Sequence, residues 1–304
     1  MKKFIKSVFL FSIFAVLFYC FAVLMAGKIF PKFLKRKVLT ENKISASDFS
    51  NKRYKDAAKS KPVDIMILGS SHAYRGYDVR LFNKGGYSSY NLGSSAQTLS
   101  LTAFIYNNFV EQLKPNKIII DIYPLLLTKN GEEGELNLLP LFYKDISFIG
   151  NTFKAFDVSV LNSLIYFQAF GNPSAVKSKM SHKEEYIDGG YISSYEITKD
   201  SKKYEPTILT IEEKNINALK NIIADAEAKG IKVYLFQSPL PEERYKSFRN
   251  NKEIDSLMRS IGVYYNYNEV GFLPTEYFFD DSHINQKGVD VYNEWVIKKI
   301  KENE

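Results

Sequence analysis

Residues 63–71 read Val-Asp-Ile-Met-Ile-Leu-Gly-Ser-Ser, and this stretch decides the fold that we predict. Its apolar run is typical of a buried strand, and the Gly-Ser pair that follows is typical of a turn. Comparable strand-like runs lie at residues 90–92, 117–123, 231–236 and 263–265, and helical patterns lie at 97–113, 210–229 and 285–300. Strands that alternate with helices in this way predict a mostly parallel sheet with helices on both faces, a three-layer α/β/α fold.

Two of the predicted helices begin with capping signals. Residues 210–213 read Thr-Ile-Glu-Glu, the spacing of a capping box, and Asn285 stands directly before the last helical pattern. Residues 125–209 interrupt the alternation, and they contain one predicted helix, from Asn151 to Phe170. Because a structureless loop of this length would be unusual, we expect a large insertion over the sheet edge or the functional site.

The N-terminal part of the chain contains a candidate membrane span. Residues 7–26 form a run of 20 residues without a charge, long enough to cross a hydrocarbon core of about 30 Å. A cleaved signal peptide is the alternative, but its apolar region is normally shorter and ends in a small-x-small site, which Leu24-Met25-Ala26 matches poorly. We therefore predict an uncleaved anchor in residues 1–27, a basic stalk in residues 28–60 and an α/β domain in residues 61–304.

The net charge of +7 is distributed unevenly along the chain. Residues 1–60 hold 13 basic and 3 acidic residues, a net charge of +10, whereas residues 61–304 hold 28 basic and 31 acidic residues, a net charge of −3. The basic residues thus flank the membrane span, where they can meet anionic head groups, and nucleic acid is not a predicted partner. Basic residues lie on both sides of the span, so they do not fix its orientation, although a short cationic N-terminus favours an extracytoplasmic domain. The single cysteine, Cys20, lies inside the span, which excludes disulfides and thiol catalysis in the domain.

Three polar clusters follow strands or precede the last helix, where parallel sheets collect functional residues. They occupy residues 69–78, 91–97 and 280–285. Ser71 stands where a nucleophile would follow the first strand, and His283 can remove its proton while Asp280, three residues earlier, orients the imidazole. The alternatives are a turn-forming serine, an ordinary histidine near a helix start, and Asp281 in place of Asp280.

These residues resemble the sequence blocks of a known family, the SGNH (GDSL-like) hydrolases and acyltransferases. Gly69-Ser70-Ser71 resembles the first block, Gly-Asp-Ser, Asn91-x-Gly93 resembles the second block, and Asp280-x-x-His283 resembles the last block. The resemblance implies a flavodoxin-like α/β/α domain that needs no cofactor. It also implies that Ser71 is the nucleophile, that His283 and Asp280 are the base and acid, and that the Ser71 and Gly93 N–H groups hold the oxyanion.

The third block of that family, Gly-x-Asn-Asp, is absent. Residues 122–124 read Ile-Tyr-Pro where it would be expected. The family's asparagine oxyanion donor is therefore unassigned, and Gln97 and Tyr123 are the candidate substitutes. A simple turn glycine is the alternative role for Gly93.

Three further residues are weaker candidates for substrate binding, namely Asn91, Arg75 and His72. Arg75 could hold an anionic group of a substrate, or it could form an ion pair, for example with Asp78, and His72 could be structural. The three histidines of the chain show no zinc spacing, and no phosphate-binding glycine loop occurs. The sequence therefore predicts neither a metal nor a nucleotide cofactor.

The anchor makes the pattern most similar to membrane-bound branches of the family, the D-alanyl-transfer protein of teichoic acid modification and the acetyltransferases of exopolysaccharide assembly. The resemblance implies a serine esterase or O-acyltransferase that acts on acyl, above all acetyl, esters of an envelope glycan or glycolipid. It also implies that a polytopic membrane protein could supply acyl groups. A non-catalytic, membrane-tethered binding or assembly protein is the competing interpretation.

Overall fold

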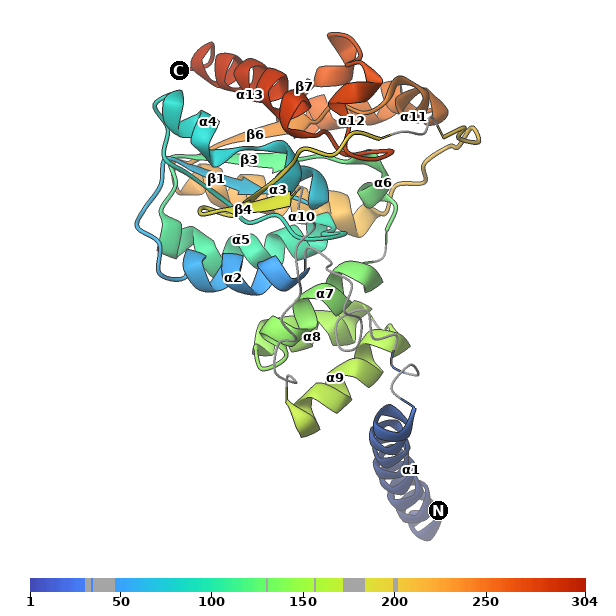
Figure 1. The fold of residues 1–304 in the computed structure, drawn as a ribbon. Helices are drawn as coiled ribbons and strands as arrows, with labels where there is room; N and C mark the ends of the chain where they lie inside the picture. Colours follow the sequence, from blue (N-terminus) through green and yellow to red (C-terminus); the bar gives the residue numbers. More distant parts are fainter. Residues whose placement is uncertain (31–33, 35–46, 130, 156, 172–183, 199–201) are drawn as a thin grey trace. The chain divides into compact units, whose positions relative to one another are not determined.

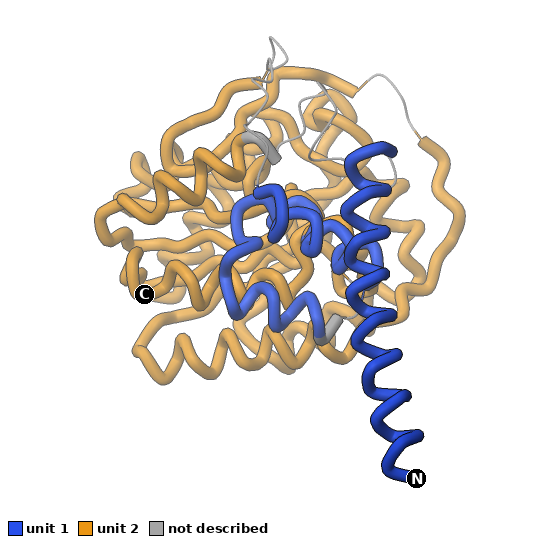
Figure 2. The backbone as a smooth tube through the Cα atoms, turned by 90° about the horizontal axis from the view of Figure 1, so that it is seen from below, with its two compact units in different colours: residues 1–43, 135–177 blue, residues 44–134, 178–304 orange. Residues whose placement is uncertain are grey.

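The computed structural model describes residues 1–304 except 31–33, 35–46, 130, 156, 172–183 and 199–201. The chain divides into two compact units, shown in different colours in Figure 2. The first unit comprises residues 1–43 and 135–177, and the second comprises residues 44–134 and 178–304. Residues 31–33 and 35–46 of the predicted stalk lie outside the described residues, and Ser47–Ala57 of the same stretch forms a helix that belongs to the second unit.

The second unit contains a five-stranded sheet in which every pair of neighbours is parallel. Its strands are β1 (Ile65–Leu68), β2 (Ser89–Asn91), β3 (Lys117–Asp121), β6 (Lys232–Gln237) and β7 (Val263–Asn266), in the order β2-β1-β3-β6-β7. The predicted parallel sheet is thus confirmed, and the strand bounds differ from the predicted ones by one or two residues at most ends. The order reverses direction between β1 and β3, which is the kind of position where open α/β sheets bind their ligands.

Helices cover both faces of this sheet (Figure 1). The helices α4 and α13 lie on one face, and α2, α5 and α10 lie on the other. The helical elements of the unit are α2 (Ser47–Ala57), α3 (Ser71–Gly76), α4 (Val79–Lys84), α5 (Leu99–Leu113), α6 (Pro124–Leu127), α10 (Glu213–Ala228), α11 (Glu242–Ser247), α12 (Asn251–Ile261), α13 (Gln286–Lys301) and the 3-10 turns η2 (Tyr267–Glu269) and η3 (Thr275–Tyr277). The three-layer α/β/α prediction is therefore confirmed.

The two capping predictions had different outcomes. The Asn285 side chain accepts hydrogen bonds from the backbone N–H groups of Lys287 and Gly288, so it caps α13 as predicted. The predicted capping box at residues 210–213 is wrong, because α10 begins only at Glu213 and its N-cap makes no side-chain hydrogen bond.

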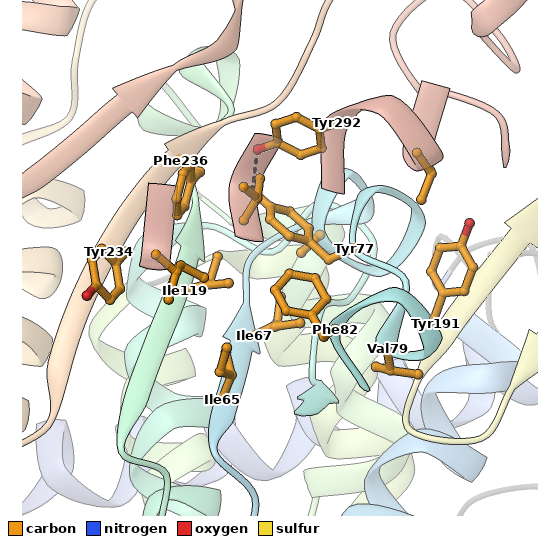
Figure 3. Packing of buried hydrophobic residues seen from close by; sticks show 14 of the residues in the cluster. Ile65, Ile67, Tyr77, Val79, Phe82, Ile119, Tyr191, Tyr234, Phe236 and Tyr292 are labelled. Carbon is orange, nitrogen blue, oxygen red and sulfur yellow. Dashed lines mark hydrogen bonds between the residues drawn. The ribbon is translucent and has the colours of Figure 1, made fainter. Parts of the chain in front are cut away.

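The core on the α13 side of the sheet is rich in aromatic residues (Figure 3). Ile65 and Ile67 alternate along β1 and face this layer, and Tyr77 and Tyr292 close over them. Burying each such side chain contributes about 1.5–3 kcal/mol to folding. The Tyr77 and Tyr292 hydroxyls hydrogen-bond each other at 2.8 Å, which satisfies polar groups inside an apolar layer.

The segment predicted as an insertion contains more regular structure than expected. It contributes α7 (Glu132–Phe142), α8 (Ile146–Ala155), α9 (Val158–Phe170) and an antiparallel hairpin of β4 (Glu184–Ile187) and β5 (Tyr191–Ser194). The single helix predicted over residues 151–170 is wrong. The Asp157 carboxylate accepts hydrogen bonds from the N–H groups of Ser159 and Val160, so it starts a new helix in the middle of that range.

The first unit contains the N-terminal helix α1 (Lys2–Ile29), most of α7, α8 and α9. Among the described residues, α1 is the helix long and apolar enough to cross a membrane, a property shared by anchors and signal sequences. Its N-terminal half extends beyond the other helices of this unit (Figure 2), and its apolar side chains are largely exposed.

Candidate active site

The structure brings Ser71, His283 and Asp280 together in a hydrogen-bonded chain. The Ser71 hydroxyl oxygen lies 2.7 Å from His283 Nε2. His283 Nδ1 lies 2.8 Å from Oδ2 and 3.0 Å from Oδ1 of Asp280. Because a carboxylate only accepts, Nδ1 carries the ring proton, and Nε2 is left to accept from the serine hydroxyl. This is the arrangement in which a serine can be activated as a nucleophile.

The loop that carries Asp280 and His283 is held by hydrogen bonds to its own backbone. Asp280 Oδ1 accepts hydrogen bonds of 2.8 Å from the N–H groups of both Ser282 and His283. Burial by itself would raise the pKa of the Asp280 carboxyl, but the hydrogen bonds and the charge of His283 outweigh burial and hold this pKa below its ordinary value. Asp281, the alternative acid, instead forms an ion pair with Lys202 at 2.6 Å. The geometry thus favours Asp280 as the partner of the histidine.

The position of Ser71 depends on a tight turn at the end of β1. Gly69 has a φ of 138°, and a Cβ atom there would lie 3.0 Å from the Cβ of Asp121 and 3.1 Å from that of Ala73. A side chain at position 69 would therefore be strained and crowded. The next residue, Ser70, caps α3 by accepting a hydrogen bond from the His72 N–H, so Ser71 occupies the first position of that helix.

The predicted oxyanion donors differ in what they contact. The Gly93 N–H donates to Asn91 Oδ1 at 3.1 Å, so in this structure it already has a hydrogen-bond acceptor within the protein. The Gln97 amide accepts from Ser94 at 2.7 Å and donates to Thr102 at 3.1 Å. Gln97 is 2% exposed and is not among the residues that line the pocket described below, so its assignment as an oxyanion donor is wrong.

The predicted substrate-binding role of Asn91 is also corrected by the structure. Its side-chain NH₂ donates to the carbonyl oxygens of Ala73 and Tyr77, and it is fully buried. It therefore ties the end of β2 to α3 and does not face a substrate. A buried amide must satisfy its own hydrogen bonds, and here the backbone provides all of them.

Arg75 lines the pocket, but with a different partner from the predicted one. Its guanidinium forms an ion pair with Glu184 of β4 at 2.6 Å and lies over the Phe279 ring. Asp78 instead pairs with Arg80 at 2.7 Å. The expectation of an Asp78 partner is thus wrong, because the hairpin, which is distant in sequence, brings a carboxylate closer.

His72 contacts both the loop that carries His283 and the turn before Ser71. Its Nε2 lies 3.0 Å from the Ser282 carbonyl oxygen, which can only accept, so Nε2 carries the ring proton. Its ring stacks on Tyr123 with 3.9 Å between centroids and lies 4.5 Å from the His283 ring. Burial lowers the pKa of His72 well below its ordinary value, so the ring is neutral. Its Nδ1 faces the Ser70 hydroxyl at 3.4 Å, so both nitrogens already have protein contacts and a substrate-binding role is not supported.

An open pocket of about 690 Å³ lies in front of Ser71 and His283. Its wall includes Tyr74, Tyr123, Ala96 and Arg244. A volume in this range is typical of small-molecule sites. Among the described residues, no group of three or more His, Cys, Asp or Glu side chains is placed to hold a metal ion.

Sequence reasoning missed Arg244. Its guanidinium lies between the rings of Tyr204 and Phe248, at 4.6 and 4.8 Å, and donates to the Tyr123 hydroxyl at 3.2 Å. Within the described part of the chain it has no carboxylate partner. The only available signal was its position shortly after β6, at the same sheet edge as the other clusters.

No protein-family model matches the chain, and no curated protein matches its sequence. Several solved structures are similar to it. A GDSL-like lipase from Bacteroides thetaiotaomicron has a TM-score of 0.42 at 16% identity, over 84% of this chain and 100% of that one. An esterase from a Pseudoalteromonas species has a TM-score of 0.39 at 11% identity, over 78% and 96% of the two chains. An acetylxylan esterase from Geobacillus stearothermophilus has a TM-score of 0.41 at 9% identity, over 79% and 95%. These are distant similarities, so a reaction can be inferred only from the site itself.

Proposed function

We propose that this chain is a membrane-anchored serine esterase or O-acyltransferase of the SGNH type. Its substrates are acyl esters, above all acetyl esters, of cell-envelope glycans or glycolipids. The observation that carries the proposal is the chain of hydrogen bonds from Ser71 through His283 to Asp280 beside an open pocket. Two partly exposed aromatic side chains on the pocket wall, Tyr123 and Phe279, are surfaces on which sugar rings can stack.

The proposed reaction begins with an attack of Ser71 Oγ on the ester carbonyl carbon. His283 Nε2 takes the hydroxyl proton, and Asp280 stabilises the imidazolium that forms. The Ser71 N–H, at the first position of α3, has no acceptor among the described residues and is available to the oxyanion. As the C–O bond of the ester breaks, His283 returns the proton to the leaving alcohol.

The acyl-serine intermediate is then resolved by a second alcohol or by water. His283 takes the proton of the incoming hydroxyl, the acyl–Oγ bond breaks, and Ser71 recovers its proton from His283. A sugar hydroxyl as acceptor gives a transferase and water gives an esterase. The anchor α1 supports an envelope substrate, because it would hold the catalytic domain at the membrane, on the extracytoplasmic side in this proposal. A polytopic membrane protein could there supply the acyl groups.

Replacing Ser71 tests the proposal. Ser71→Ala in the full chain, purified in a non-ionic detergent, should reduce turnover of 4-nitrophenyl acetate to background, because the nucleophile is lost. Ser260→Ala changes an exposed serine whose hydroxyl bonds only its own helix, and it should leave turnover unchanged. Full retention of activity in Ser71→Ala would refute the assignment.

A non-catalytic binding or assembly protein is the second candidate. The observation in its favour is that the Gly93 N–H is committed to Asn91, and that the third family block is absent. A fluorophosphonate probe distinguishes the two functions, because it reacts only with an activated serine. Labelling of the wild type that is lost in Ser71→Ala supports the enzyme. Absence of labelling, together with retained glycan binding, supports the binding protein.

A further inference from the structure

Helix α9 packs against the second half of α1 within the first unit. The Tyr19 hydroxyl donates to Asn162 Oδ1 at 2.6 Å. Eight residues further along α1, a Cβ atom on Gly27 would lie 2.7 Å from Cδ2 of Tyr166, so the Tyr166 ring of α9 packs directly against the Gly27 backbone. Val23, between these two contacts, is buried. A small residue in the contact between two helices and a hydrogen bond between their polar side chains are both typical of helix pairs in membranes.

Tyr19 and Val23 lie within the segment of α1 that would lie in the bilayer, and Gly27 directly follows it. A span over residues 7–26 fills a hydrocarbon core of about 30 Å. Tyr19 lies seven residues before the end of this span, or about 10 Å along the helix axis. If α1 crosses the membrane over this range, the Tyr19–Asn162 hydrogen bond lies inside the hydrocarbon layer. Because Asn162 belongs to α9, at least the middle of α9 then lies in the same layer.

The composition of α9 fits such a location. Its 13 residues, VSVLNSLIYFQAF, contain no charge, and at about 20 Å the helix is too short to cross the core alone. The interior of the helix pairs its own backbone groups, the Asp157 carboxylate accepts from two N–H groups at its start, and the Asn162 side chain is paired with Tyr19. Its two ends expose apolar side chains, Val158 at 54% and Phe170 at 52%. Exposure of this kind is unfavourable in water but not among lipid chains.

Neighbouring α8 extends the exposed apolar surface of this unit. Ile146 is 87% exposed and Phe153 is 58% exposed. Among the described residues that follow α1, eight large apolar side chains are more than half exposed, and four of these eight lie on the two consecutive helices α8 and α9. Apolar side chains exposed on two consecutive helices next to the candidate span are those that lipid chains could cover.

We propose that α9 is embedded in the leaflet that contains the C-terminal half of α1, where lipid acyl chains cover its exposed face. This inference rests on α1 being a membrane anchor, which is part of the proposed function. The first unit is then held by a pair of helices and not by a single anchor. Because α9 belongs to the segment that leaves the sheet after β3 and returns before β6, the bilayer holds the catalytic domain at two points of its sequence.

Fluorescence from single labelled positions tests this inference in the full chain. Cys20→Ala removes the only cysteine, and Val158→Cys or Phe170→Cys then carries an environment-sensitive NBD label in phosphatidylcholine–phosphatidylglycerol vesicles. Phe14→Cys, on the exposed surface of α1 (64%), is the lipid reference, and Val270→Cys, on an exposed turn (63%), is the water reference. At least one α9 label should show blue-shifted emission and at least half the quenching by doxyl-labelled acyl chains that the Phe14 position shows.

The outcomes separate the inference from the proposed function. If both α9 labels behave like Val270 while the Phe14 label is quenched, the anchor stands and the embedding of α9 is refuted. If the Phe14 label also behaves like Val270, the anchor itself fails and the inference fails with it. Should the cysteine variants misfold, photoactivatable acyl-chain diazirines in the same vesicles give the answer for the unmodified chain. Crosslinks in the peptide that contains residues 158–170 would support the inference, and crosslinks confined to α1 would overturn it.

Discussion

The buried carboxyl of Asp121 provides the sharpest quantitative prediction. Asp121 ends β3 and contacts the turn that positions Ser71, and it is 3% exposed. Its Oδ2 accepts hydrogen bonds from the Ser238 and Tyr77 hydroxyls, whereas Oδ1 has no partner among the described residues. Burial raises the pKa of Asp121 from 3.8 to about 7, although the two hydroxyls oppose this shift. The folded protein therefore keeps a proton on this group that the unfolded chain has lost.

The direction of the pH effect follows from this proton. Between about pH 4 and pH 7 the folded state binds more protons at Asp121 than the unfolded state, so stability falls as the pH rises. The stability that the protonated Asp121 carboxyl allows is fully present below about pH 4 and is lost above about pH 7. At high pH the shift lowers the free energy of unfolding by an amount on the order of 4 kcal/mol. About 2–3 kcal/mol of this loss falls between pH 5 and pH 8.

Asp121→Asn removes this titration and keeps an acceptor oxygen for the two hydroxyls. We expect the free energy of unfolding of the variant, relative to the wild type, to rise by about 2–3 kcal/mol from pH 5 to pH 8. Urea unfolding of both proteins, followed by near-ultraviolet circular dichroism in the same detergent, measures this difference at each pH. A difference that stays constant over this range would show that Asp121 does not remain protonated in the folded protein.

Three further predictions concern the site. Asp280→Asn should lower kcat for an acetyl ester by about 10⁴-fold, because His283 loses the partner that sets its tautomer, and a loss below tenfold in the folded variant would contradict this role. Gly93→Ala should destabilise the protein by about 1–3 kcal/mol, because overpacking forces the backbone apart where the new Cβ would lie 2.8 Å from the Ser70 carbonyl oxygen; thermal unfolding measures this, and an unchanged midpoint would count against it. His72→Phe should lower kcat by about 10-fold or more at nearly constant KM, since the loss of about 1–3 kcal/mol of hydrogen bonding loosens the loop that carries the base, and steady-state kinetics that show an effect on KM alone would refute this positioning role.

The fold could be predicted from the sequence because its signals are local. The apolar run ending at Gly69 and the cap at Asn285 each depend on neighbouring residues, and both appear in the structure within a residue or two. The failures are also local in origin. Asp157 offered a helix cap inside a run that looked continuous, and its two backbone hydrogen bonds divided the predicted helix.

The side-chain partners could not be predicted in the same way. Asn91 and Gln97 have the chemistry of substrate or oxyanion contacts, yet both amides are satisfied inside the protein. Arg75 pairs with Glu184, which is 109 residues away in sequence. Such choices depend on which donor and acceptor the fold places nearest, and no spacing rule encodes that distance.

The sequence by itself determined the strand–helix alternation, the charge-free run of residues 7–26 and the candidates for nucleophile, base and acid. Each of these follows from periodicity, run length or short spacing, which are set by residues next to one another in the chain. Only the tertiary structure decided that Ser71 meets His283 across 212 residues at 2.7 Å, and that Tyr19 in the apolar helix α1 donates a hydrogen bond to Asn162 of α9. These contacts depend on packing, because their distances are fixed only when the sheet and the helices have closed around them.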